Sequence, residues 1–81
     1  MLKVCLSGPL KAAADGAASV AINAATIREL LRELVKLYPD MQSQLDDGIA
    51  ISVNGQIFRD SWSEMIPEDA EVYLLPRIQG G

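Results

Sequence analysis

Residues 26–39, with the sequence TIRELLRELVKLYP, carry the strongest structural signal in the chain. Thr26 and Glu29 match a capping box, in which both side chains accept hydrogen bonds from backbone groups at the start of a helix. Pro39 cannot continue a helix. The apolar residues recur at spacings of three and four, which places them in one stripe along a helix: Ile27, Leu30, Leu31, Leu34, Val35 and Tyr38. We predict an amphipathic helix whose stripe lies in the core.

Short strands and turns are predicted after this helix. Residues 40–48 favour a further helical turn that ends at a glycine. Ile49–Val53 is an apolar strand, and Asn54-Gly55 is the dipeptide typical of a two-residue hairpin. Gln56–Phe58 is then the returning strand. We therefore expect a hairpin directly downstream of the helical region.

The last part of the predicted domain leads into one more strand. A second capping-box match, Ser61-x-x-Glu64, predicts a short helical turn over residues 62–66. A tight turn follows, and then the strand Glu71–Leu75. Pro76 ends this strand or holds it at an edge, because proline has no backbone donor.

Upstream of the helix, two strands predict a hairpin. Leu2–Ser7 alternates apolar and polar residues and ends at Gly8-Pro9. Residues 11–18 are small and polar enough for a loop, and Ser19–Asn23 is the second strand. The complete order predicts an α+β fold of the β-grasp (ubiquitin-like) type, with a mixed sheet of about five strands and one main helix packed on one face.

The length and composition limit what the chain can do. Its 81 residues suit one domain, which we place at residues 1–76, with 77–81 as a flexible tail. Cys5 is the only cysteine, and there is no histidine. The chain therefore lacks the commonest general base and the commonest metal ligand, and it cannot form an internal disulfide. We expect a protein without catalytic residues, a metal site or a bound cofactor.

The charge is distributed unevenly along the chain. Residues 1–36 hold five basic and three acidic side chains, whereas residues 37–81 hold two basic and eight acidic ones. The acidic half would repel nucleic acids and anionic membranes and attract a partner with a basic surface; an effect on solubility alone is the alternative. The N-terminus lacks the pattern of a signal peptide. We therefore expect a cytoplasmic protein with neither a nucleic-acid partner nor a membrane partner.

The tail, Arg77-Ile78-Gln79-Gly80-Gly81, follows directly on the last predicted strand. Five residues extend at most about 17 Å, which would carry the Gly81 carboxylate into a partner's active site. Glycine has no Cβ, so the backbone could lie close to another surface. Adenylation by ATP would turn the carboxylate into a good acyl donor for a sulfur or amine nucleophile. Such chemistry needs no catalytic side chain on this chain.

Over nearly its whole length the chain resembles the MoaD/ThiS sulfur carriers, the prokaryotic relatives of ubiquitin. In the small subunit of molybdopterin synthase, the last strand ends in two bulky apolar residues. Pro-Pro, an apolar residue, a variable residue and Gly-Gly follow. Leu74-Leu75, Pro76, Ile78 and Gly80-Gly81 match this pattern, and Arg77 stands in place of the second proline. The turn before the strand has Asp69-Ala70 where the family commonly has a glycine.

The resemblance implies a carrier that is activated by other proteins. An adenylyltransferase of the ubiquitin-activating type would use ATP to adenylate Gly81. A sulfur donor enzyme would then convert Gly81 to a thiocarboxylate. The thiocarboxylate would supply sulfur to a large synthase subunit, in molybdenum cofactor biosynthesis. The residues implied to thread the partner's active site are Gly80, Gln79, Ile78, Arg77 and Pro76.

Three apolar residues are further candidates for docking a partner: Leu74, Leu75 and Phe58. Leu74 and Leu75 point to opposite faces of a strand, so one can fill the core while the other meets a partner. Several alternatives for the function stay open. The chain could serve thiamine or another sulfur-transfer pathway, or it could be a protein modifier joined to other proteins through Gly81. It could also be a passive binding module whose Gly-Gly is incidental.

Overall fold

A five-stranded mixed sheet in the order β2-β1-β5-β3-β4 forms one layer of the molecule. The computed structural model describes residues 1–59 and 61–76. The central strands β1 and β5 are parallel, and every other neighbouring pair is antiparallel. The strands are β1 (Leu2–Cys5), β2 (Ser19–Ile22), β3 (Ile49–Val53), β4 (Gln56–Phe58) and β5 (Glu71–Pro76).

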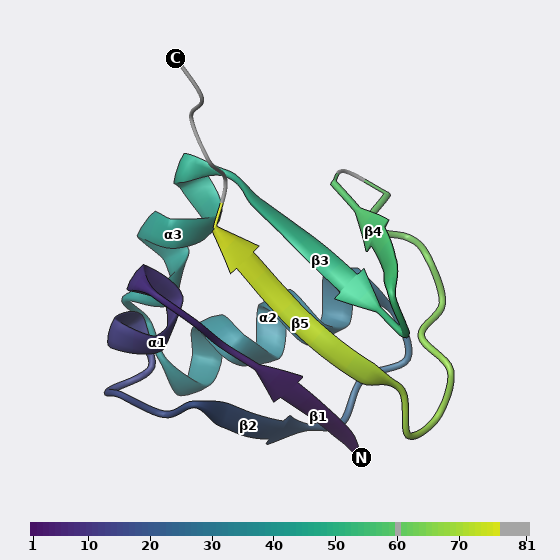
Figure 1. The fold of residues 1–81 in the computed structure, drawn as a ribbon. Coiled ribbons are helices and arrows are strands. Elements are labelled where there is room, and N and C mark those ends of the chain that lie inside the picture. Colours follow the sequence, from purple (N-terminus) through teal and green to yellow (C-terminus); the bar gives the residue numbers. More distant parts are fainter. Residues whose placement is uncertain (60, 77–81) are drawn as a thin grey trace.

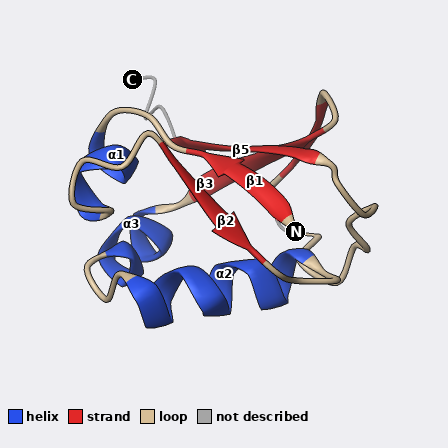
Figure 2. Ribbon diagram, turned by 90° about the horizontal axis from the view of Figure 1, so that it is seen from below, coloured by secondary structure: helices blue, strands red, loops and turns tan. Residues whose placement is uncertain are grey.

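Three helices pack on one side and at one end of this sheet and leave its other face open (Figures 1 and 2). They are α1 (Pro9–Ala13), α2 (Ile27–Leu37) and α3 (Met41–Asp47). The predicted α+β, β-grasp fold with one main helix is confirmed. The proposed division into a domain of residues 1–76 and a tail of residues 77–81 stays a prediction, because the tail lies outside the described residues. In the part that the structure describes, no helix is both long and apolar enough to span a membrane.

The main helix forms as its sequence predicts. Its stripe faces the sheet, and Ile27, Leu30 and Leu34 have no exposed surface. The Glu29 N–H donates to Thr26 Oγ1 at 3.2 Å, which confirms Thr26 as the N-cap. The Glu29 carboxylate in turn accepts from the N–H of Ala25, at 2.9 Å. The helix ends at Leu37. The next residue, Tyr38, is extended, because a residue that precedes a proline is disfavoured in the helical conformation.

Of the helical turn predicted over residues 62–66, only a tight turn at its start forms, in which the Glu64 N–H donates to the Ser61 carbonyl at 3.1 Å. In place of a helix, the carbonyl of Trp62 accepts the Arg28 N–H at 2.8 Å, and the carbonyl of Glu64 accepts the Ile27 N–H at 3.1 Å. The first N–H groups of any α-helix lack partners inside that helix. Residues 62–66 therefore supply carbonyls to the start of α2, and this pairing replaces the local helix that their own pattern favoured.

The loop predicted over residues 11–18 is also partly wrong, because residues 11–13 belong to α1. Pro9 lies at the first position of this helix, where its missing N–H costs nothing. Gly8 precedes it with a φ of 58°, and Leu10 is fully buried. The alanines that suggested a loop are strong helix formers, and one buried leucine suffices to hold the short helix on the core.

The hairpin between β3 and β4 has the predicted turn. Asn54 and Gly55 both have positive φ, at 50° and 89°, as the two central positions of a type I′ turn require. A second tight turn precedes β5, where the Ala70 N–H donates to the Pro67 carbonyl at 3.2 Å. Asp69 adopts the left-handed conformation in this turn, with a φ of 60°.

The strands add a row of valines to the core between the sheet and the helices. The strand register places Val20, Val4, Val72 and Val53 side by side across β2, β1, β5 and β3. Val4 and Val72 have no exposed surface and Val53 is 7% exposed, whereas Val20 at the sheet edge is only partly buried. The row is therefore closed in the middle of the sheet and left partly exposed at Val20, whereas Ile22, the other inward residue of β2, is 2% exposed.

Candidate functional site

The candidate site begins where β5 ends. This strand lies between β1 and β3, and its last residue, Pro76, is in register with Ile49 of β3. The structure thus places Pro76, the residue before the predicted tail, at the end of the central strand of the sheet. The predicted carrier residue Gly81 and its four neighbours Arg77, Ile78, Gln79 and Gly80 lie outside the described residues.

The two leucines of β5 face opposite sides of the sheet, as their alternation predicts. Leu74 is 1% exposed and lies in the core, so it has no surface to offer a partner. Leu75 is half-buried on the open face, in register with Ala50. Phe58 pairs with Ile51 and packs against the core from the edge strand β4. Of the three candidate docking residues, Leu75 alone lies on the open face.

Two apolar residues beside Leu75 were missed by the sequence analysis. Tyr73 and Ile57 are 43% and 49% exposed, and the strand register aligns both with Ser52 on the open face. The signal for Tyr73 was present in the sequence, because a period of two places it on the same side as Leu75. Ile57 required the register of the β3–β4 hairpin, which only the turn at Asn54-Gly55 defines.

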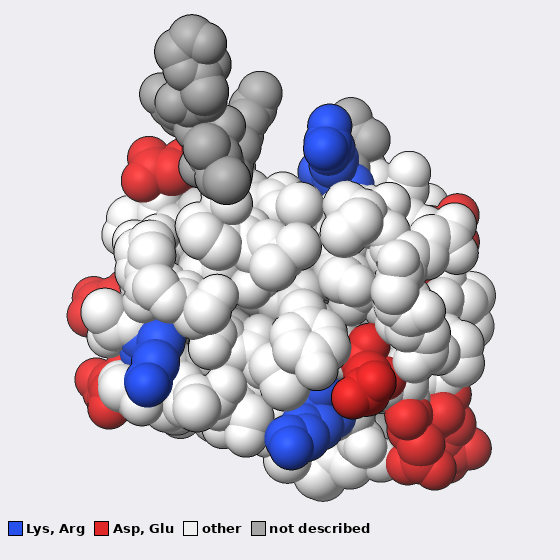
Figure 3. All heavy atoms as spheres, in the orientation of Figure 1, with Lys and Arg blue, Asp and Glu red and all other residues white. Residues whose placement is uncertain are grey.

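An apolar area in the middle of this open face is bordered by charged residues. Figure 3 views this side of the molecule, and blue and red side chains adjoin the white area from below as well as lying around the outline. Lys3 and Glu71, in register on the two central strands, lie on the same face. We call the exposed and half-buried residues Tyr73, Ile57, Leu75 and Ala50 the open-face patch. Such an apolar centre within a charged rim is typical of a protein-docking surface.

Tyr73 gives the open-face patch a polar group at its centre. The nearby Glu71 carboxylate, and then the Cys5 thiol, raise the pKa of the Tyr73 hydroxyl above its ordinary value of 10.0. The hydroxyl is therefore protonated at neutral pH and can both donate and accept a hydrogen bond. Cys5 lies beside Tyr73 in the strand register and is half-buried with a free thiol. Within residues 1–59 and 61–76, no cluster of side chains could hold a metal ion.

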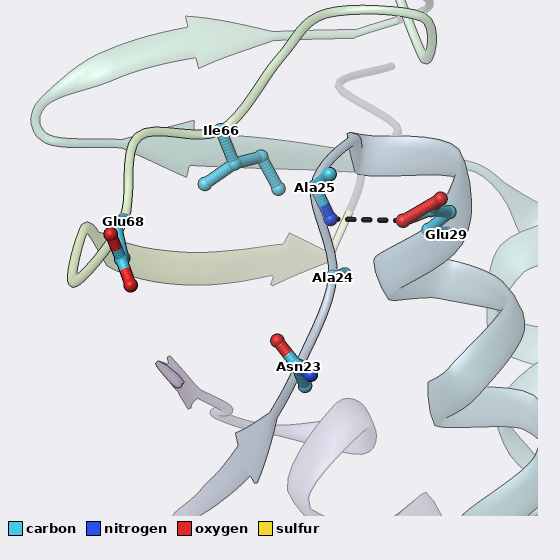
Figure 4. A pocket seen from close by; sticks show the side chains of 6 residues that line it. All are labelled: Asn23, Ala24, Ala25, Glu29, Ile66 and Glu68. Carbon is cyan, nitrogen blue, oxygen red and sulfur yellow. Dashed lines mark hydrogen bonds between the residues drawn. The ribbon is translucent and has the colours of Figure 1, made fainter.

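A separate hollow of about 400 Å³ lies at the other end of the sheet (Figure 4). It opens between the segment that follows β2 and the segment that precedes β5. Glu29 comes from the start of α2, where its carboxylate holds the Ala25 N–H. The residues that line the hollow are Asn23, Ala24, Ala25, Glu29, Ile66 and Glu68. The two carboxylates make it acidic, and it does not adjoin the end of β5.

Comparison with known proteins agrees with this architecture. The model of the ThiS family matches residues 4–81, which is nearly the whole chain. The crystal structure of SAMP1 from Haloferax volcanii is 26% identical, with a TM-score of 0.82 over 99% of this chain and 98% of that chain. None of the curated proteins that were compared with the chain matches its sequence.

Two structures of complexes have the same fold at lower identity. One is the BexX/CysO complex of Amycolatopsis orientalis, whose matching chain is 19% identical, with a TM-score of 0.82 and full coverage of both chains. The other is the complex of subunits 1 and 2 of the molybdopterin-converting factor of Helicobacter pylori. Its matching chain is 24% identical, with a TM-score of 0.69, over 99% of this chain and 97% of that chain.

Proposed function

The chain belongs to the ThiS family, and from this premise we propose that it carries sulfur on Gly81 for a synthase of the molybdopterin type. Proteins of this family are ubiquitin-like sulfur carriers and are not themselves catalytic, and both statements hold for this chain. The choice of pathway and the role of each tail residue are the proposal. It is carried by one observation, the end of the central strand β5 at Pro76 beside the open-face patch.

The chemistry takes place at the carboxylate of Gly81. One carboxylate oxygen attacks the α-phosphate of ATP, and pyrophosphate leaves, which produces an acyl-adenylate. Hydrosulfide supplied by the sulfur donor enzyme then attacks the Gly81 carbonyl carbon, and the C–O bond to AMP breaks. The product is a thiocarboxylate, whose sulfur can later pass to a substrate while water restores the carboxylate. The catalytic groups for each step belong to the adenylyltransferase, the sulfur donor enzyme and the large synthase subunit.

The open-face patch is suited to hold such a partner in place. Tyr73 and Leu75 lie on β5 itself, and Pro76 follows immediately. A partner seated on these side chains would have its active site within the reach of five further residues, about 17 Å. We propose that Leu75 docks the partner together with Tyr73 and Ile57, and that Phe58 supports the edge of this surface from the core side.

Intact mass measurement tests the proposal. The protein is incubated with ATP, an activating enzyme and a sulfur donor, in its native form and as the variant that lacks Gly81. We expect a gain of about 16 Da in the native protein, where sulfur replaces one oxygen, and no gain in the variant. An unchanged native mass under conditions that activate a known carrier would refute the proposal. Co-purification of a large synthase subunit with the native protein tests the pathway.

A second candidate function is that of a protein modifier joined to other proteins through Gly81. The observation that favours it is the 26% identity with SAMP1 of Haloferax volcanii over almost the entire chain. The SAMP1 of Methanosarcina acetivorans is described as small archaeal modifier protein 1. In this case the incubation would give a ladder of larger conjugates. A passive binding module would give neither product, and its binding would survive the loss of Gly81.

A further inference from the structure

The edge of the sheet at β2 offers unpaired backbone groups. In the described part of the chain, β2 is bonded to β1 alone. The Leu6 N–H donates to the Ala18 carbonyl at 2.9 Å, and bonded and non-bonded positions alternate along an antiparallel pair. The backbone of Val20 therefore faces β1, whereas the backbone N–H and C=O groups of Ser19 and Ala21 face away from the sheet.

This edge lacks the features that usually protect an edge strand. Proteins commonly place charged residues, prolines or bulges on such strands to prevent pairing with another chain. Residues 16–27 contain no charged residue and no proline, and β2 pairs regularly with β1 over four residues. The opposite edge strand, β4, is only three residues long and is followed by Arg59. The two edges therefore differ, and β2 is the one open to an added strand.

At this edge, one inward-facing side chain of the sheet is left partly exposed. Val20 is the terminal member of the valine row, and it stays partly exposed while Val4 and Val72 are fully buried. An added strand would place one of its side chains beside Val20 on the helix-covered side of the sheet. An apolar side chain at that position would extend the row and remove the exposed part of Val20 from water.

The acidic hollow lies where β2 ends. Asn23, Ala24 and Ala25 follow the strand directly and form one wall of the hollow, and Glu68 projects from the facing segment (Figure 4). Glu29 lines it from the start of α2. A strand that lay along β2 would run toward these residues, and the negative charge of the hollow would favour a positive side chain there.

We propose that the β2 edge binds an extended segment of a partner protein, antiparallel to β2, with an apolar residue beside Val20 and a lysine or arginine over the acidic hollow. The charge of the hollow favours such a partner over a second copy of this chain. Antiparallel pairing of two β2 strands about Ala21 would bring the uncharged residues 17–19 of the other copy beside residues 23–25, which line the hollow. This inference goes beyond the proposed function, because β2 lies two strands away from β5.

A blocked hexapeptide, acetyl-Arg-Ser-Val-Thr-Val-Thr-amide, is a direct probe. Paired antiparallel, it places its valines beside Ile22 and Val20 and its arginine beside Ala24. Titration into the full chain, followed by amide NMR, should shift the signals of residues 19–25. Amide hydrogen exchange at Ser19 and Ala21 should slow at least fivefold, because their N–H groups gain partners. Shifts centred on the open-face patch, or unchanged exchange at Ser19 and Ala21, would overturn the proposal.

Three variants separate the backbone pairing from the charge effect. Ala21→Pro removes an outward donor that the fold does not use, and it should weaken peptide binding at least tenfold. Glu68→Gln should weaken binding about threefold. Glu64→Gln, which removes an equal charge outside the hollow, should leave the affinity unchanged. If Ala21→Pro fails to fold, the comparison of Glu68→Gln with Glu64→Gln still tests the proposal. Equal losses of peptide affinity in these two variants would contradict a cation in the hollow. Concentration-dependent dimerisation of the free chain through β2 would assign the edge to a second copy instead.

Discussion

The two faces of β5 differ in what they contact, although the same six residues supply both. Leu74 and Val72 point into the core and are almost completely buried. Tyr73 and Leu75 point to the open face, where no helix covers them (Figure 2). One face therefore contributes to stability, while the other can be altered with little cost to the fold. A strand of this kind leads from the core directly to the residues predicted to form the tail.

The largest expected effect is a difference in stability between variants of the two leucines of β5. Leu74→Ala should lower the free energy of unfolding by about 3 kcal/mol, because it leaves a cavity in a fully packed core. Leu75→Ala should cost less than about 1 kcal/mol, since its side chain is half-exposed. Urea denaturation followed by circular dichroism measures both. Equal losses for the two variants would mean that the open face is also covered in solution.

A charge on the open face should weaken partner binding and leave the stability of the fold nearly unchanged. Ile57→Asp should weaken the complex with the adenylyltransferase about tenfold, or about 1.4 kcal/mol, while the unfolding midpoint stays near that of the native chain. The measurement is isothermal titration calorimetry. Gln56→Asp is the matched control, because the neighbouring residue on the same strand points away from the open face. Equal weakening by both variants would indicate a general charge effect and not contact with Ile57.

A substitution in the turn that leads into β5 should increase the free energy of unfolding. Asp69 has a φ of 60°, and Asp69→Gly should raise the free energy of unfolding by about 0.5 kcal/mol, because glycine adopts this conformation without strain. The Met1 ammonium lies 3.8 Å from Asp69 in an exposed pair, which contributes little in water. Asp69→Ala, which keeps a Cβ but loses the polar side chain, should lower stability. Thermal unfolding of the two variants compares them.

The smallest expected effect concerns Tyr73 alone. Its raised pKa comes first from Glu71, so Glu71→Gln should lower the pKa of the Tyr73 hydroxyl toward 10.0. Because the folded state holds the proton more tightly than the unfolded state, this contribution to stability is fully present below pH 10 and is lost as the pH rises from 10 through the raised pKa of the folded state. Phenolate absorbance, measured in a Tyr38→Phe background, reports this titration. An unchanged pKa would exclude Glu71 as its cause.

Much of the fold was predictable because its signals are local. The stripe and cap of α2 lie within fourteen consecutive residues, and the hairpin turn at Asn54-Gly55 requires two positive φ angles that these residues tolerate. The tail pattern was equally local, and it led to the same family as the match over residues 4–81. The docking residues were harder to predict. Of the three predicted docking residues, Leu74 lies in the core and Phe58 packs against the core. The exposure of a strand residue depends on which strands become its neighbours, and the local sequence does not show this.

Two matches to the same capping-box pattern, Thr26-x-x-Glu29 and Ser61-x-x-Glu64, show where local information ends. The sequence alone determined the helix that starts at Thr26, because an apolar stripe supports its cap with burial. It also determined that Leu74 and Leu75 face opposite ways. Only the tertiary structure decided that the pattern at Ser61 forms no helix, because its carbonyls pair with the unfilled N–H groups of α2. It likewise decided which leucine is buried, since the helices pack on one side of the sheet and leave the other side exposed.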